Sequence, residues 1–275
     1  MAGTDPVPIV QLGPADASAG LALSTEAHWN QNQADWRFFL TQGTVFGVRD
    51  ESGDLVATAA LLPYTSGNAW ISMVLVTASW RRRGLATRLV DTCLEAAAQQ
   101  HLTTWLDATP EGAAVYGPLG FVPTLQLRRL RLEHSAPPTA GAPTSTADLD
   151  EFIARDSGAM GFDRRALLAE LGGRPSSRLW SHGDAAALVR DGRKARHIGP
   201  LFAGSPDQAL AMVGEIARSE SGPLLIDAVH TQTEFLDGLT SSGWTIERPF
   251  QRMRFGRAPA QLKGLPFAVA GPEYG

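Results

Sequence analysis

Three consecutive arginines followed by a glycine are the residues in this sequence best suited to bind an anion. The whole stretch has seven residues, which are Arg81, Arg82, Arg83, Gly84, Leu85, Ala86 and Thr87. A helix that begins here presents unpaired backbone N–H groups and the positive end of its dipole. Because Gly84 and Ala86 have little or no side chain, an anion can approach the main chain closely. The stretch predicts a diphosphate site; the alternative is an ordinary turn with solvated arginines.

The residues on either side indicate how this stretch is held. Residues 71–76 form a short apolar run of strand length, and Trp70 begins it. After the turn, Leu85, Leu89 and Cys93 recur at the spacing of an amphipathic helix. The expected unit is therefore strand, basic turn and helix. It matches neither the GxGxxG nor the GxxxxGK[ST] phosphate loop.

A second group of residues with chemical potential lies downstream in TPEGAAVYGPLGF, residues 109–121. Thr109 can cap a short helix, because Pro110 in the first turn loses only an N–H that would be unpaired anyway. Tyr116 lies on that helix, and Gly120 and Phe121 open the next strand. We expect the strand before this helix over residues 104–108.

Together these features resemble the GCN5-related N-acetyltransferase (GNAT) family. Its coenzyme loop has the pattern [Q/R]-x-x-G-x-[G/A], which Arg81, Gly84 and Ala86 fill, and Tyr116 with Gly120-Phe121 matches its second signature. The resemblance implies an α+β fold, with a mixed and mostly antiparallel twisted sheet flanked by helices. It also implies acetyl-CoA as co-substrate, without a metal.

The resemblance assigns roles along this path. The pantetheine arm would pair with the main chain of Val74, Leu75 and Val76, and the diphosphate would lie on residues 81–87. The N–H of Val74 or Leu75 would stabilise the oxyanion that forms when an amine attacks the thioester directly, in a ternary complex. Tyr116 would protonate the departing thiolate, unless it is packed for shape alone.

The acceptor side is less specified by the sequence. The resemblance places Trp29 and Asn30 in the segment that walls the acceptor pocket, although Trp29 also suits a surface aromatic. Asp107 and Asp227 are either contacts for a cationic acceptor or capping carboxylates. The strand before the loop carries no carboxylate, so the general base stays open between Asp107, Asp227 and a chain of water molecules.

The second half of the chain repeats the first in outline. Leu106-Asp107-Ala108 corresponds to Ile226-Asp227-Ala228, and Gly120-Phe121 corresponds to Gly243-Trp244. Ser205-Pro206-Asp207 replaces the arginine loop, and a carboxylate at that helix start would repel phosphate. We therefore predict two GNAT-like domains, residues 1–134 and 147–275, joined by a Pro/Ser/Thr-rich linker at 135–146. The second domain is expected to be a degenerate copy that binds no coenzyme.

Composition narrows the class of protein. The 275 residues are 44% apolar and 19% charged, as in globular proteins, and a net charge of −4 argues against nucleic-acid binding. Cys93 is the single cysteine, the histidines show no metal-ligand spacing, and no run is long enough to span a membrane. We expect a cytoplasmic monomer or homodimer that acetylates a small-molecule amine or a peptide N-terminus. The alternative is a non-catalytic acyl-CoA sensor.

Overall fold

The computed structural model describes residues 7–133, 148–257 and 264–275. Two compact units make up the chain: unit 1 is residues 1–63 and 67–105, and unit 2 is residues 64–66 and 106–275. The predicted linker at 135–146 lies outside the described residues. Most of β3 is in unit 1, and β5 runs from unit 1 into unit 2 at Leu106.

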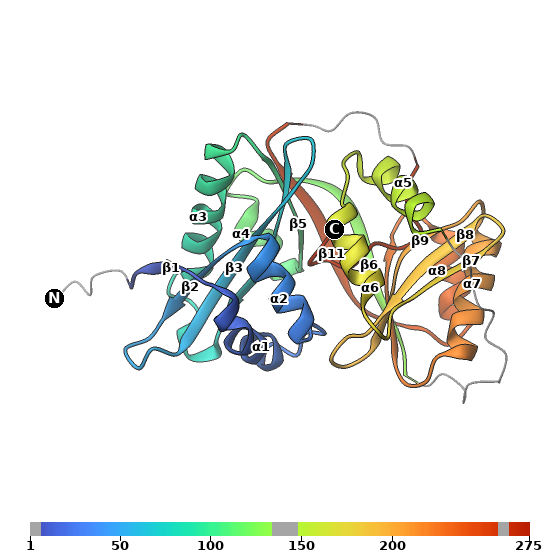
Figure 1. The fold of residues 1–275 in the computed structure, drawn as a ribbon, viewed down its shortest axis with the longest axis horizontal. Coiled ribbons are helices and arrows are strands. Elements are labelled where there is room, and N and C mark those ends of the chain that lie inside the picture. The colour runs from blue at the N-terminus through green and yellow to red at the C-terminus, as the bar shows by residue number, and fades with distance from the viewer. Residues whose placement is uncertain (1–6, 134–147, 258–263) are drawn as a thin grey trace. The chain divides into compact units, whose positions relative to one another are not determined.

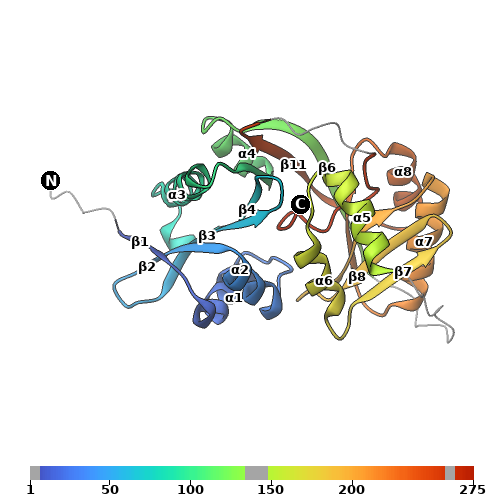
Figure 2. The ribbon, with the colours of Figure 1, turned by 45° about the horizontal axis from the view of Figure 1, so that its top comes forward.

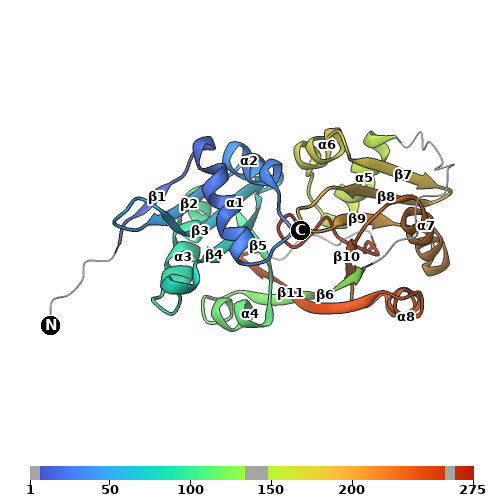
Figure 3. The same ribbon diagram turned by 90° about the horizontal axis from the view of Figure 1, so that it is seen from below.

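Unit 1 is a sheet covered by helices on both faces. Figure 3 shows α1 and α2 on one face of its strands and α3 on the other. Strands β1, β2 and β3 follow one another antiparallel, whereas β4 and β5 are parallel. The elements are β1 (Ile9–Gln11), η1 (Pro14–Asp16), α1 (Ala17–Glu26), α2 (Gln33–Gln42), β2 (Thr44–Arg49), β3 (Leu55–Tyr64), β4 (Asn68–Val76), η2 (Ala78–Trp80), α3 (Leu85–Gln99) and β5 (Thr103–Ala108).

Unit 2 is also a mixed, mostly antiparallel sheet with helices. Strand β6 pairs antiparallel with both β10 and β11, β6 and β11 are 11 residues long, and β9 runs parallel to β10. Figures 1 and 2 show α7 packed along the strands β7–β9. The elements are α4 (Pro110–Tyr116), β6 (Val122–Leu132), α5 (Leu149–Met160), α6 (Arg165–Gly173), β7 (Arg178–His182), β8 (Ala185–Arg190), β9 (Arg196–Phe202), α7 (Pro206–Ser219), β10 (Leu224–Val229), α8 (Thr233–Ser241) and β11 (Thr245–Phe255).

Capping residues explain where the helices begin. The Asn32 side chain accepts hydrogen bonds from the N–H groups of Ala34 and Asp35, at 2.9 and 3.1 Å, and Asp35 accepts from the Asn32 N–H at 2.8 Å. This reciprocal capping box starts α2. The Thr109 hydroxyl accepts from the Gly112 N–H and starts α4, as predicted. Gly43 is the C-cap of α2.

The sequence pattern located most elements of the first half and missed several of the second. The predicted 104–108 strand and the predicted helix after the arginines at 81–83 are confirmed by β5 and α3. Helices α5 and α6 and strands β7 and β8 were not predicted. All six residues of β8 are buried, so it shows none of the alternation that reveals a strand with one solvated face.

No helix in the described part of the chain is both long and apolar enough to cross a membrane.

Candidate functional site: the β4–α3 loop of unit 1

Strand β4 changes direction in its middle. Met73 has φ = 51°, a left-handed conformation that is rare for a residue with a side chain. The Thr58 hydroxyl on β3 donates a buried hydrogen bond of 2.8 Å to the Met73 carbonyl and so fixes this kink. Such a kink re-aims the following main-chain groups. It lies immediately before Val74, the first residue predicted to bind the pantetheine arm.

The parallel pairing of β4 with β5 occupies the first part of β4. Its register pairs Asn68 with Thr103, Ala69 with Thr104 and Trp70 with Trp105. The indole rings of Trp70 and Trp105 stack with centroids 6.5 Å apart, and the Trp105 Nε1 donates to Asn68 Oδ1 at 2.9 Å. Beyond this locked end, β4 continues through the kink to Val76.

The arginine loop lies between β4 and α3 and is exposed. Gly84 is the N-cap of α3 in the left-handed conformation, with φ = 76° and ψ = 4°, and a Cβ there would meet no atom within 4 Å. Arg81 donates from Nε to the Val76 carbonyl at 3.1 Å. Arg83 donates to the Ser79 carbonyl at 3.1 Å, and its guanidinium lies 4.6 Å from the ring centre of Trp80. The loop therefore holds its arginines through main-chain and aromatic contacts.

The two helices that connect the strands of a parallel pair, α3 between β4 and β5 and α7 between β9 and β10, differ at their first turns. No side chain caps the N-terminus of α3, so the donors of Leu85, Ala86 and Thr87 are available to an anion. At α7, the Ser205 hydroxyl accepts from the Gln208 N–H at 3.3 Å, and Asp207 lies in the first turn. A capped start beside a carboxylate disfavours an anion. The arrangement suits a diphosphate at α3.

Glu26 is a residue of this loop that sequence reasoning missed. Its carboxylate accepts from the Thr77 hydroxyl at 2.7 Å and from the Ala78 N–H at 2.8 Å, which ties the end of α1 to the start of η2. These two hydrogen bonds lower the pKa of Glu26. The sequence held no signal for this contact, because the two segments are far apart in the chain.

Cys93 lies on the buried face of α3. Its side chain is completely covered, and burial raises the pKa of its thiol to about 12. A thiol that stays protonated is a poor nucleophile. Cys93 is therefore poorly placed to act as a nucleophile.

The predicted acceptor residues of unit 1 lie in the loop between α1 and α2. Asn30 is buried, with 7% of its surface exposed. Trp29 is partly buried, and its backbone N–H donates to the Ser24 carbonyl at 2.9 Å. Within the described residues, the buried Gln31 Oε1 and Ser72 Oγ have no hydrogen-bond partner. Both are polar groups that a bound acceptor could satisfy, and the sequence analysis did not single them out.

Tyr116 is the last residue of α4 in unit 2. Its half-buried ring packs against Phe121, with centroids 6.0 Å apart and a tilt of 56°. Its carbonyl accepts from the N–H groups of Leu119 and Phe121, at 3.1 and 3.2 Å. The motif TPEGAAVYGPLGF thus folds back on itself, so that the tyrosine and the Gly-Phe pair are in contact. The role of the hydroxyl as an acid stays a prediction.

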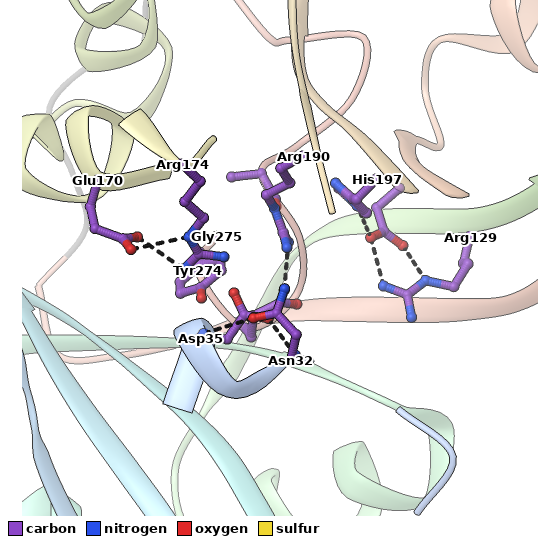
Figure 4. Close-up of polar contacts among 12 residues, drawn as sticks. Asn32, Asp35, Arg129, Glu170, Arg174, Arg190, His197, Tyr274 and Gly275 are labelled. Atoms are coloured by element: carbon purple, nitrogen blue, oxygen red, sulfur yellow. Dashed lines mark hydrogen bonds and ion pairs between the residues drawn. The ribbon is translucent and has the colours of Figure 1, made fainter. Parts of the chain in front are cut away.

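The two predicted carboxylates are buried in unit 2 and bound to arginines. Asp107 accepts two hydrogen bonds from Arg252, at 2.8 and 2.9 Å, and burial raises its pKa although the arginine opposes this. Asp227 accepts from Arg129 at 2.8 and 2.7 Å, and from His197 Nε2 at 2.9 Å. Figure 4 shows Arg129 and His197 on either side of one carboxylate. Burial alone would raise the pKa of Asp227, but these partners lower it.

Further buried ion pairs surround the 264–275 segment. Arg190 donates to Glu273 at 2.7 Å and to the Ala270 carbonyl at 3.1 Å. Arg164 pairs with Asp156 and also donates to the Tyr274 carbonyl, and Figure 4 shows Arg190 and Tyr274 near each other. Among the described residues, no group of histidine, cysteine and acidic side chains could hold a metal ion.

Comparison with known proteins agrees with this geometry. The profile of the acetyltransferase (GNAT) family matches residues 17–121, and an acetyltransferase (GNAT) domain profile matches residues 153–267. The uncharacterized N-acetyltransferase YitH of Bacillus subtilis (strain 168) is 25% identical over 247 residues, which are 86% of this chain and 87% of that protein.

Solved structures share the fold along most of the chain. A candidate acetyltransferase from Pyrococcus horikoshii has a TM-score of 0.79 and 19% identity, and the match covers 100% of this chain and 98% of that one. A GCN5-related N-acetyltransferase from Sphaerobacter thermophilus has a TM-score of 0.68 and 18% identity, covering 94% and 98%. A tandem GNAT protein from the clavulanic acid biosynthesis pathway has 0.64 and 17%, covering 93% and 100%. Two matching domains in succession show that the protein belongs to the GNAT acetyltransferase family and is a tandem member of it.

Proposed function

We propose that this protein transfers an acetyl group from acetyl-CoA to the amine of a small molecule or a peptide N-terminus. The observation that carries the proposal is the exposed loop of unit 1 between the kinked strand β4 and helix α3. The loop carries the arginines, and Gly84 at its end is the N-cap of α3 and provides no side-chain cap. Its match to the GNAT family supplies the identity of the anion, the diphosphate of coenzyme A. The N–H groups of residues 85–87 bind that diphosphate, and Arg81, Arg82 and Arg83 add charge.

The strand orients the reacting group. Val74, Leu75 and Val76 offer their main chain to the pantetheine arm, which is bound as an added strand would be. The kink at Met73 directs the N–H of Val74 or Leu75 toward the thioester carbonyl, where it stabilises the developing negative charge. Bound coenzyme supplies the activated acetyl group; the residues of this chain supply position and charge.

Proton transfers complete the reaction. The neutral amine nitrogen adds to the acetyl carbon to give the oxyanion, which collapses as the carbon–sulfur bond breaks, and Tyr116 protonates the departing thiolate. The nitrogen then gives up its second proton to solvent, and solvent returns a proton to Tyr116. The attacking amine first loses the proton that it carries at neutral pH. Arg252 forms two hydrogen bonds with Asp107, and Arg129 forms two with Asp227. Because both carboxylates are bound in this way, we assign this proton to water and not to either of them. We assign acceptor contacts to Trp29 and Asn30.

The coenzyme site is tested by a charge reversal in the loop. Arg83→Glu should weaken binding of coenzyme A by about ten- to a hundredfold in titration calorimetry, since it replaces an attraction to the diphosphate by a repulsion. Arg37→Glu is the matched control, because it makes the same charge change on the exposed side of α2. Equal affinities for both variants would refute the placement of the diphosphate.

Turnover is tested by thiol release from acetyl-CoA across a panel of amines and peptides. The enzyme should release thiol only when an acceptor is present, and mass spectrometry should show an acceptor that is heavier by one acetyl group. Tight coenzyme binding without acceptor-dependent release would favour the acyl-CoA sensor. The absence of a carboxylate from residues 70–73 of β4 is the observation in favour of that second function.

A further inference from the structure

A short segment of the chain lies between two parallel strands of unit 2. Strands β9 and β10 pair over residues 196–198 and 224–226, and the 267–269 segment continues the sheet beyond that point. On one side, the Phe267 N–H donates to the Leu201 carbonyl at 2.8 Å, and the Leu201 N–H donates to the Ala268 carbonyl at 2.9 Å. On the other side, the Val229 N–H donates to the Phe267 carbonyl, and the Val269 N–H donates to the Asp227 carbonyl, both at 3.0 Å. The segment is antiparallel to both strands.

The corresponding position in unit 1 follows from the strand register. Trp70 pairs with Trp105, which directly precedes Leu106-Asp107-Ala108. His197 pairs with Leu225, which directly precedes Ile226-Asp227-Ala228. Trp70 therefore corresponds to His197. Four residues further along each strand lie Val74 and Leu201, which correspond in the same way. The 267–269 segment therefore binds the main chain of the residue that corresponds to Val74.

The segment is tightly seated. Ala268 is completely buried and Val269 is 1% exposed, and the Phe267 ring contacts Phe235 edge to face at 5.2 Å. The Val269 carbonyl approaches Gly199 so closely that a Cβ on that glycine would be 2.0 Å from its oxygen. Only glycine leaves room for this approach. The Arg190–Glu273 pair holds the chain just beyond the segment.

We infer that the 267–269 segment occupies, in the second domain, the strand position that the pantetheine arm takes in the first. In the second domain, a segment of the same chain therefore fills the position between the strands where a pantetheine arm would bind. The protein then binds one acyl-CoA per chain. The Ser205 cap and Asp207 at the start of α7 close the adjoining diphosphate position in the same domain. The location of the pantetheine arm in this inference depends on the proposed function. The position of the 267–269 segment between β9 and β10 does not.

Hydrogen–deuterium exchange of the whole protein, with and without saturating coenzyme A, tests the inference. The amides of Leu201, Val229 and Val269 should exchange as slowly as those of the central strands, and coenzyme should slow exchange only around residues 74–76 and 81–89. Calorimetry should give one site per chain, which Arg83→Glu should weaken by about ten- to a hundredfold. Two sites per chain, or faster exchange at 267–269 when coenzyme is added, would overturn the inference. If no coenzyme binds at all, the proposed function fails, while exchange at 267–269 still decides whether the segment fills the position between the strands.

Two variants test the seat itself. Gly199→Ala should speed exchange at 267–269 by about tenfold or more, because the new Cβ displaces the Val269 carbonyl. Its control is Gly173→Ala, where a Cβ meets nothing within 4 Å. Val269→Pro removes the N–H that donates to Asp227 and should have the same effect, whereas Leu265→Ala, at an exposed position, should not. Unchanged exchange at 267–268 in both seat variants would contradict the inference.

Discussion

The Arg129 guanidinium and the Asp227 carboxylate form two buried hydrogen bonds, at 2.8 and 2.7 Å. Arg252 and Asp107 form the equivalent pair, at 2.8 and 2.9 Å. Arg129 and Arg252 each stand nine positions after the glycine of a Gly-aromatic pair, Gly120 or Gly243. Each aspartate thus binds the arginine that follows the Gly-aromatic pair of the other repeat. The two repeats therefore hold each other's aspartates through buried ion pairs, which we call the exchanged pairs. Both pairs lie within unit 2, where β6 pairs with β10.

The exchanged pairs predict large and similar losses of stability. Removing Arg129 or Arg252 by substitution with alanine takes the arginine from a buried carboxylate, although Asp227 keeps its hydrogen bond with His197, so each variant should lose about 3–5 kcal/mol of unfolding free energy. Urea titration followed by circular dichroism measures the loss. Arg131→Ala is the control on β6: its partners Glu133 and Glu247 are 59% and 35% exposed, so its loss should stay below about 1 kcal/mol. Losses for Arg129→Ala no larger than this control would contradict the assigned importance of the pair.

Gly84 is predicted to be required for the shape of the coenzyme loop. With φ = 76°, an alanine at this position is strained by about 1–2 kcal/mol even though the surrounding space is open. Gly84→Ala should therefore lower stability by this amount or shift the backbone, and it should weaken coenzyme A binding in calorimetry. Gly13→Ala, at an open position with φ = −125°, serves as the control and should change neither property. Wild-type affinity and stability in Gly84→Ala would show that the left-handed cap is dispensable.

Tyr116→Phe separates proton donation from shape. The variant keeps the ring that packs on Phe121 but lacks the hydroxyl, so kcat should fall by about 10²–10⁴-fold while coenzyme affinity stays unchanged. Steady-state kinetics of thiol release measure kcat, and calorimetry measures affinity. A variant with full turnover would remove Tyr116 as the acid.

Cys93 predicts a specific loss of stability at alkaline pH. Burial raises the pKa of the thiol to about 12 in the folded protein, from its ordinary value of 9.0. Because the folded pKa is raised, its contribution to stability is fully present below pH 9.0 and is lost as the pH rises toward about 12. The unfolding free energy should fall in that window by roughly 1 kcal/mol per pH unit more than in Cys93→Ala, as measured by urea titrations. Parallel pH dependences for both proteins would refute the raised pKa. Rapid alkylation of the native thiol at neutral pH would contradict its burial.

The sequence by itself determined the family, the strand–loop–helix unit and the position of the tyrosine helix. These features depend on contacts between near neighbours: the arginine loop, the period of α3 and the Thr109 cap are each complete within a few residues. For the same reason, local patterns located β4, α3, β5 and α4. They also showed that the second half repeats the first, because the Asp-Ala strands and the Gly-aromatic pairs recur in order.

Only the tertiary structure decided what the two aspartates contact and where the 267–269 segment lies. Arg129 and Asp227 are 98 residues apart, and Arg252 and Asp107 are 145 apart, so neither pairing leaves a periodic trace in the sequence. The kink at Met73 and the Glu26 contact to the loop likewise depend on neighbours from other strands and helices. Sequence periodicity reports which face of an element is buried, whereas the partner of a buried charge is set by how the chain returns to it in space.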